Sequence, residues 1–184
     1  MLEVRALGLE GVLEILPPRL ADDRGFFSEI WSERSFAAAG LHLTFVQDNH
    51  SLSRDVGVLR GLHFQTPPLA QAKLVRVSRG AVFDVAVDIR SSSPTCGQWV
   101  GARLSAAEWN QMLIPVGFAH GFLALEPDTD VQYKVTAPYS REHDRAIRFD
   151  DPAIGIEWPM EREALILSDK DRAAPMLADI DTGF

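Results

Sequence analysis

The chain of 184 residues contains a single cysteine, Cys96. One cysteine cannot form a disulfide within the chain, a composition typical of proteins in reducing compartments. No apolar stretch resembles a signal sequence or is long enough to cross a membrane. We therefore expect a cytoplasmic protein that does not act at a membrane.

Basic residues are also scarce, since 18 Lys and Arg stand against 26 Asp and Glu and give a formal net charge of −8. Proteins that follow a nucleic-acid backbone need a surplus of Lys and Arg to displace its counterions. The charge therefore argues against nucleic acid as the partner and favours a small molecule. It does not exclude a basic pocket, because a net charge is only an average over the surface.

The content of 46% hydrophobic residues is enough to build one buried core in a chain of this length. Glycines and prolines occur in small groups between short apolar stretches, with no internal repeat, low-complexity tract or linker. We predict one domain that spans residues 1–184.

Short segments in which apolar residues recur at every second position follow one another along the chain. Residues 73–77 and 82–89 show this period on either side of a turn at residues 78–80. Further segments of this kind are residues 98–104, 112–115, 121–125 and 131–135. A period of two predicts half-buried strands, and many short strands bounded by turns favour an all-β sandwich or barrel over a parallel sheet with crossover helices.

Helical signals are few. Residues 32–39, ended by Gly40, predict a short helix, and residues 105–108 have the spacing of a capping box, enough for one turn between strands. The tail from Glu161 onward mixes charged and apolar residues without a clear period, so we expect irregular structure that packs on the sheet.

His63 is the first candidate functional residue. In a regular strand over residues 60–65, Gly61, His63 and Gln65 face one side, and Arg60 faces the other with the apolar residues. His63 then points into a cavity from a segment that Gly61 makes thin. The same pattern, taken alone, also fits a hydrogen-bonded core or rim histidine.

His120 follows a turn marked by Pro115 and Gly117. Without a functional role, the pattern fits a tight turn with an exposed imidazole. Two histidines raise the possibility of a metal site, because imidazole is a common ligand. However, the order His63-Phe64-Gln65 does not place two imidazoles on one face of one strand, and we predict no metal.

Other polar residues have a structural and a functional interpretation. Tyr133 lies on a predicted strand, and Tyr139, the second of only two tyrosines, lies in the following loop; a buried tyrosine is more often a core residue. Lys73 begins a strand and could be an edge charge that discourages aggregation. Residues 168–171 have the composition of a solvated turn.

Several of these residues belong to motifs that occur in a fixed order along nearly the whole chain. The motif segments are residues 23–29, 47–51, 59–65, 73–88, 92–99, 114–122, 133–134 and 151–159. In these segments the sequence resembles the dTDP-4-dehydrorhamnose 3,5-epimerase family, cupin-fold enzymes of dTDP-L-rhamnose synthesis.

The resemblance implies a cupin-type jelly roll of antiparallel strands with a few short helices, in agreement with the strand pattern. It implies an isomerase that acts on a dTDP-4-keto-6-deoxyhexose without a metal or organic cofactor. It further implies a homodimer in which N-terminal strands are shared and contribute to the partner's site.

The resemblance also implies roles for individual residues. His63 is the general base, Asp171 its carboxylate partner, Tyr133 the general acid and Lys73 the stabiliser of the enolate. The residues implied to contact substrate are Arg24, Glu29, Gln47, Asn49, Arg60, His120, Tyr139, Asp144 and Lys170. Among these, Tyr139 stacks on the thymine ring, and Asp144 stands where the family carries glutamate.

Three alternatives to a 3,5-epimerase remain. A single-position epimerase, acting at C3 or C5 of a related dTDP-sugar, shares the same residues. A non-catalytic sugar-nucleotide-binding cupin could keep the pocket, although His63, Tyr133 and Asp171 are all present. A metal-dependent cupin oxygenase or isomerase is disfavoured because no second imidazole lies beside His63.

Overall fold

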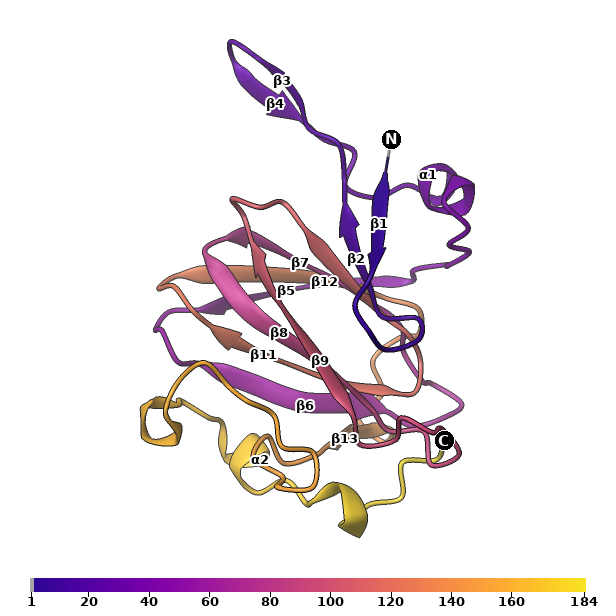
Figure 1. The fold of residues 1–184 in the computed structure, drawn as a ribbon, viewed down its shortest axis with the longest axis vertical. Helices are drawn as coiled ribbons and strands as arrows, with labels where there is room; N and C mark the ends of the chain where they lie inside the picture. Colours follow the sequence, from indigo (N-terminus) through magenta and orange to yellow (C-terminus); the bar gives the residue numbers. More distant parts are fainter. Residues whose placement is uncertain (1) are drawn as a thin grey trace.

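The computed structural model describes residues 2–184, which form two antiparallel sheets packed face to face (Figure 1). The first sheet has the order β1 (Glu3–Ala6), β2 (Leu13–Leu16), β10 (Gln111–Ile114), β7 (Lys73–Arg79), β12 (Thr129–Val135) and β5 (Gln47–Ser53). The second has the order β13 (Asp144–Ala146), β6 (Leu59–Gln65), β11 (Phe118–Ala124), β8 (Ala81–Asp88) and β9 (Trp99–Ser105). The all-β, cupin-type jelly-roll prediction is confirmed.

The alternation in the sequence assigns the faces of β7 and β8 correctly. Val75 and Val77 of β7 pack between the sheets against Val82 and Ala86 of β8, whereas Leu74 joins a separate cluster on the outer face. Burial of these side chains, with about 1.5–3 kcal/mol from each valine, holds the two layers together. The packed sheets therefore fix the positions of the polar side chains that their strands carry.

The N-terminal part carries the predicted helix and a projecting arm. Helix α1 (Glu33–Ala38) begins after Ser32, whose Oγ accepts a hydrogen bond from the backbone N–H of Ser35. Strands β3 (Leu20–Asp22) and β4 (Gly25–Phe27) form a hairpin that stands away from the sandwich (Figure 1). Among residues 2–184, no helix is long and apolar enough to span a membrane.

The predicted capping box at residues 105–108 forms a turn rather than a helix. The N–H of Glu108 donates to Ser105 Oγ at 3.1 Å, as the motif requires. The carboxylate of Glu108, however, accepts from Arg103 instead of from the backbone of Ser105. Half of the motif is therefore present, and the chain returns directly into β10.

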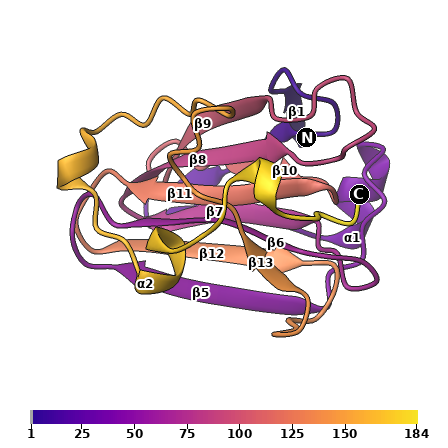
Figure 2. The same cartoon turned by 90° about the horizontal axis from the view of Figure 1, so that it is seen from below.

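The C-terminal tail is mostly irregular, as expected, with the short helices η1 (Arg162–Ala164), α2 (Asp169–Arg172) and η2 (Leu177–Asp179). It runs along β6 and covers the outer face of the second sheet, where Trp158 and Leu177 pack against a cluster that contains Leu62 (Figures 1 and 2). Near the end of the chain, Thr182 Oγ1 donates to the carbonyl oxygen of Ile89 at 2.9 Å. This packing brings α2 into contact with β6.

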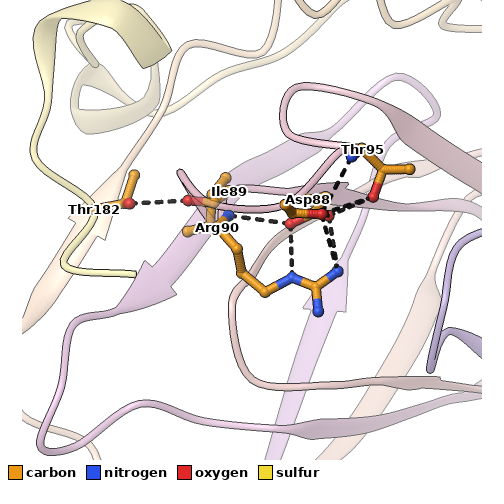
Figure 3. Close-up of polar contacts among 6 residues, drawn as sticks. Asp88, Ile89, Arg90, Thr95 and Thr182 are labelled. Carbon is orange, nitrogen blue, oxygen red and sulfur yellow. Dashed lines mark hydrogen bonds and ion pairs between the residues drawn. The ribbon is translucent and has the colours of Figure 1, made fainter.

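A buried carboxylate fixes the loop after β8 (Figure 3). Asp88 is fully buried and accepts two hydrogen bonds from the guanidinium of Arg90, at 2.9 and 2.8 Å. The hydroxyls of Ser93 and Thr95 donate to its second oxygen at 2.6 Å each. Burial alone raises the pKa of Asp88, but these donors outweigh burial and hold the pKa well below its ordinary value.

We expect Asp88→Asn to lower the free energy of unfolding at pH 7 by about 2–3 kcal/mol, because hydrogen bonds to a charged group contribute about that much. The lowered pKa of Asp88 means that its contribution is complete above the unfolded-state pKa of about 3.9 and is lost as the pH falls through the folded-state value. Urea denaturation should therefore show a smaller difference between variant and wild type at pH 3 than at pH 7. The exposed Asp55→Asn should change stability little at either pH, and an undiminished Asp88→Asn deficit at pH 3 would contradict the assignment.

Candidate active site

A cleft of about 530 Å³ lies between the two sheets and is covered in part by the C-terminal tail. All but two of the site residues that the sequence predicts line it. These are Gln47, Asn49, Arg60, His63, Lys73, His120, Tyr133, Tyr139, Asp144, Lys170 and Asp171. The structure thus brings together residues from seven different elements.

The imidazole of His63 forms a pair with the carboxylate of Asp171. His63 Nε2 and Asp171 Oδ1 lie 2.5 Å apart, and Asp171 is buried whereas His63 is partly exposed to the cleft. Asp171 is in α2, whose first turn is capped by Ser168 Oγ, so residues 168–171 are not the solvated turn that their composition suggests. A carboxylate can only accept, so the proton of neutral His63 lies on Nε2 and Nδ1 keeps its lone pair.

The ionised state of Asp171 is maintained inside the protein. Burial raises the pKa of this carboxyl, but the hydrogen bond and charge of His63, with donors from Ser168 and Gly61, bring the pKa below its ordinary value. Asp171 therefore carries a negative charge at neutral pH and stabilises an imidazolium at His63.

Arg60 and His63 line the same cleft, and the prediction that they face opposite sides is wrong. The register between β6 and β11 shifts from the pair His63 and His120 to the pair Arg60 and Phe122, so β6 has one extra residue. Gly61 lies in this bulge, where a Cβ would lie 2.5 Å from the Cα of Gly121. Only glycine fits there, and Arg60 enters the cleft that His63 lines, where its guanidinium donates to the carbonyl oxygen of Leu52 at 3.1 Å.

Lys73 is buried at the start of β7, so it is not the edge charge considered above. Its Nζ donates to the carbonyl oxygen of His63 at 3.2 Å. Burial lowers the pKa of Lys73 to about 8, while the charges of Asp84 and Asp144 act in the opposite direction. Most Lys73 side chains are still charged at pH 7 and place a positive charge beside His63.

Tyr133 faces the cleft from β12, in the sheet opposite to His63. Its side chain is partly buried, and its ring packs against the core between the sheets. Burial raises the pKa of the Tyr133 phenol, with an opposing effect from the charge of Arg60. The phenol is therefore protonated at neutral pH and can donate a proton.

His120 is buried in the middle of β11, because this strand begins at Phe118 rather than at Gly121. The interpretation as an exposed imidazole in a turn is therefore wrong. Its Nε2 lies 2.8 Å from Oδ1 of Asp84 on β8. Burial lowers the pKa of His120 despite that carboxylate, so the ring is neutral at pH 7.

Sequence reasoning missed Asp84 as a site residue. The available signal was a carboxylate at a position that shares the inner face of a strand with Val82 and Ala86. A charged group at such a position is costly unless it has a partner, and a partner implies a polar cluster inside the sandwich.

Tyr139 lies at the rim of the cleft in the loop after β12, and its side chain is exposed. Its backbone N–H donates to Gln47 Oε1 at 2.9 Å, and its hydroxyl donates to Asp144 Oδ2 at 3.4 Å. Lys170 Nζ forms an ion pair with the same carboxylate at 2.5 Å. An exposed aromatic ring therefore stands next to an exposed cation.

A second glutamine that the sequence did not single out as a site residue holds the same loop. Gln65 is buried; its Oε1 accepts from the N–H of Ser140 at 2.7 Å, and its Nε2 donates to the carbonyl oxygen of Pro138 at 3.1 Å. Since Gln65 follows His63 by two residues on β6, it ties the position of the Tyr139 loop to that of the imidazole.

Two predicted substrate contacts, Arg24 and Glu29, do not line the cleft of their own chain. Arg24 lies in the turn of the projecting arm, with a side chain that is 89% exposed and paired with Asp22. Glu29 follows the arm and accepts a hydrogen bond from Ser32 Oγ. Within residues 2–184, no three His, Cys, Asp or Glu side chains are grouped so as to hold a metal ion.

Comparison with known proteins agrees with this geometry. Residues 6–179 match the family model described as dTDP-4-dehydrorhamnose 3,5-epimerase. The chain is 51% identical over 180 residues to the dTDP-4-dehydrorhamnose 3,5-epimerase of Sinorhizobium fredii, covering 98% of this chain and 92% of that protein. It is also 51% identical over 176 residues to the enzyme of that name from Pseudomonas aeruginosa, covering 95% of this chain and 96% of that protein.

A solved structure of similar sequence also belongs to a 3,5-epimerase. The crystal structure of dTDP-6-deoxy-D-glucose-3,5-epimerase from Legionella pneumophila, in complex with dTDP-4-keto-L-rhamnose, is 44% identical in sequence. It superposes with a TM-score of 0.93 and covers 98% of this chain and 95% of that chain. The chain therefore belongs to the dTDP-4-dehydrorhamnose 3,5-epimerase family.

Proposed function

We propose that this chain converts dTDP-4-dehydro-6-deoxy-D-glucose to dTDP-4-dehydro-L-rhamnose by inverting C3 and C5 of the sugar. The observation that carries the proposal is the convergence of the His63–Asp171 pair, Lys73 and Tyr133 on one cleft, in a chain of this epimerase family. The three groups differ in chemistry, and a keto sugar needs each of them.

The substrate's ketone determines what the site must do. Hydrogens on the carbons beside the C4 ketone are acidified, because removing one yields an enolate whose charge rests on oxygen. Inversion needs a base on one face of the sugar, an acid on the other and a cation at the oxygen. His63 and Tyr133 come from opposite sheets, which suits attack on opposite faces.

In the proposed step, Nδ1 of His63 takes the proton as the C–H bond breaks. The electron pair moves into the enolate, whose oxygen is stabilised by Lys73, while Asp171 stabilises the imidazolium. Tyr133 then donates its phenolic proton to the carbon from the other face. Solvent accepts the proton of the imidazolium and returns one to the phenolate, and the cycle repeats at the second carbon.

The remaining residues of the cleft suit the nucleotide. We propose that Tyr139 stacks on the thymine ring and that Arg60 and Lys170 contact the anionic part of the substrate. Gln47, Asn49, His120 and Asp144 are the other proposed contacts; Asp144 holds Lys170 and Tyr139 at the rim. The cleft thus offers cations within a protein of net charge −8.

Incubation with dTDP-4-dehydro-6-deoxy-D-glucose in heavy water tests this function. NMR should show deuterium at both C3 and C5 of the product. Deuterium at only one carbon indicates a single-position epimerase. Binding without any exchange indicates a non-catalytic sugar-nucleotide-binding protein.

We also propose that residues 1–184 act as one domain in the cytoplasm. Side chains of both sheets share a single core cluster, which supports one cooperative unit. Cys96 is an exposed free thiol, which suits a reducing compartment.

We further propose a homodimer in which the arm of each protomer completes the cleft of its partner. The arm projects from the sandwich (Figure 1) and carries exposed apolar side chains, with Leu20 at 67% and Phe27 at 68% exposed. Contiguous exposed apolar groups of this kind are typical of protein interfaces. Such an arrangement gives Arg24 and Glu29, which do not line their own cleft, a place at the substrate.

Mixing two impaired variants should restore activity. In a dimer of Arg24→Ala and His63→Asn chains, one cleft contains an intact His63 together with the partner's intact arm. If the chains are unfolded, mixed equally and refolded, random pairing should recover about a quarter of wild-type activity, since half of the dimers are mixed and each has one complete site. Each variant refolded alone provides the control. No recovery, with mixed dimers shown by mass spectrometry, would mean that the arm does not serve the partner.

A further inference from the structure

Asp84 is a buried carboxylate that the proposed mechanism does not use. It lies on β8 behind His120, fully buried, and does not line the cleft. Its Oδ1 is 2.8 Å from His120 Nε2, and its Oδ2 has no hydrogen-bond partner among residues 2–184. A buried carboxylate oxygen without a hydrogen-bond partner lowers the stability of the fold, so its presence needs a functional explanation.

The charged groups around Lys73 show what that role is. Asp144 of β13 is paired with Lys170 of α2, and Asp171 of α2 is paired with His63 of β6. Asp84 and Asp171 are each bonded to an imidazole, but only Asp84 has a buried carboxylate oxygen, Oδ2, without a hydrogen-bond partner among residues 2–184. The other groups at the site, Arg60 of β6 and Tyr133 of β12, are a cation and a neutral phenol.

We propose that Asp84 is a positioning residue for the reaction, which keeps Lys73 charged and holds His120 with its Nδ1 lone pair open to the cleft. The proposal rests on the proposed function, because a charged Lys73 matters as the partner of an enolate oxygen. Asp84 can only accept from His120 Nε2, so the neutral ring must carry its proton there. His120 then accepts a hydrogen bond from a sugar hydroxyl.

The position of Lys73 supports the first part of the proposal: its Nζ donates to the carbonyl oxygen of His63, which pairs with His120 across β6 and β11, and His120 is bonded to Asp84. Burial lowers the pKa of Lys73 to about 8, and among the charges that oppose burial Asp84 has the largest effect. Asp84→Asn keeps the shape and an oxygen acceptor for His120 but removes the charge. Loss of a nearby opposite charge should lower the pKa of Lys73 by about 1 unit.

The chain is well suited to a direct measurement, because it has only three lysines, Lys73, Lys134 and Lys170. Protein labelled with ¹³C at the lysine ε carbon gives three signals, and Lys73→Arg identifies that of Lys73. The titration midpoint of Lys73 should fall by about one pH unit in Asp84→Asn and return to its wild-type value in Asp84→Glu. An unchanged midpoint in Asp84→Asn would overturn the proposal.

Asp88→Asn is the matched control, since Asp88 is a buried carboxylate on the same strand but outside the cleft. It should lower stability and leave the midpoint of Lys73 unchanged. An equal shift in both variants would mean that general loosening, rather than the charge of Asp84, moves the midpoint. If Asp84→Asn does not fold, the smaller neutral Asp84→Ser is titrated in its place, with the same expectation.

Two further readouts complete the test. The alkaline limb of the kcat profile should move with the Lys73 midpoint, so that kcat at pH 7.5 falls about threefold, while KM changes little. Two-bond ¹H–¹⁵N spectra should show the His120 proton on Nε2, and a proton on Nδ1 would overturn the second part of the proposal. If the wild-type protein does not act on the keto sugar, the proposed function fails, but the NMR titration still decides whether Asp84 controls Lys73.

Discussion

Replacing His63 with asparagine should lower kcat for epimerisation at both carbons by about 10³-fold, because a general base contributes about 10²–10⁴-fold to such reactions. Asparagine has similar size and can still bond to Asp171, but its amide cannot take a proton from carbon. Lys73 and Tyr133 stay in place, so the variant loses the general base but keeps the structure of the site. Deuterium incorporation at C3 and C5 in heavy water measures it.

Binding of dTDP separates this explanation from a general defect. The proposed nucleotide contacts, Tyr139 and Lys170, lie at the rim and do not depend on His63, so the Kd for dTDP should stay within about threefold of the wild-type value. His50→Asn is the matched control, since His50 is an exposed histidine paired with Asp130 and does not line the cleft. Near-wild-type exchange in His63→Asn, or an equal loss of dTDP binding, would contradict the role of His63 as the base.

The strands and their faces follow from the sequence because they depend on local alternation. In β7 and β8 every second side chain faces the core between the sheets, and this period can be read from the strand's own sequence without knowing its neighbours. The bulge in β6 is different, since the position of one extra residue is defined only against β11. A period of two therefore misplaced Arg60 relative to His63, at the point where the strand serves the site.

The site is less predictable than the fold because its contacts join distant parts of the chain. Asp171 is 108 residues from His63, and its own segment has the composition of an exposed turn. Its role came from the resemblance to a family and not from local pattern. Asp84 and Gln65 were missed for a related reason: their partners lie on other elements, and a lone polar residue in a strand does not show what it binds.

Tyr133→Phe should separate two events that the wild-type enzyme couples. The base, its carboxylate partner and Lys73 remain, so the enolate still forms and His63 can return a solvent-derived proton to the face from which it removed one. Loss of a general acid should lower the rate of inversion by about 10²-fold or more, whereas exchange should fall much less. The phenyl ring still fills the space against the core, since only the hydroxyl is removed.

The ratio of the two rates tests this assignment directly. In heavy water, NMR should show substrate that acquires deuterium with retained configuration faster than product appears. Tyr139→Phe, at the only other tyrosine, should leave the ratio at its wild-type value, because that ring is proposed to bind the nucleotide and not the reacting carbons. If exchange and inversion decline together in Tyr133→Phe, Tyr133 acts before the enolate forms, and the proton that completes inversion must come from another group in the cleft.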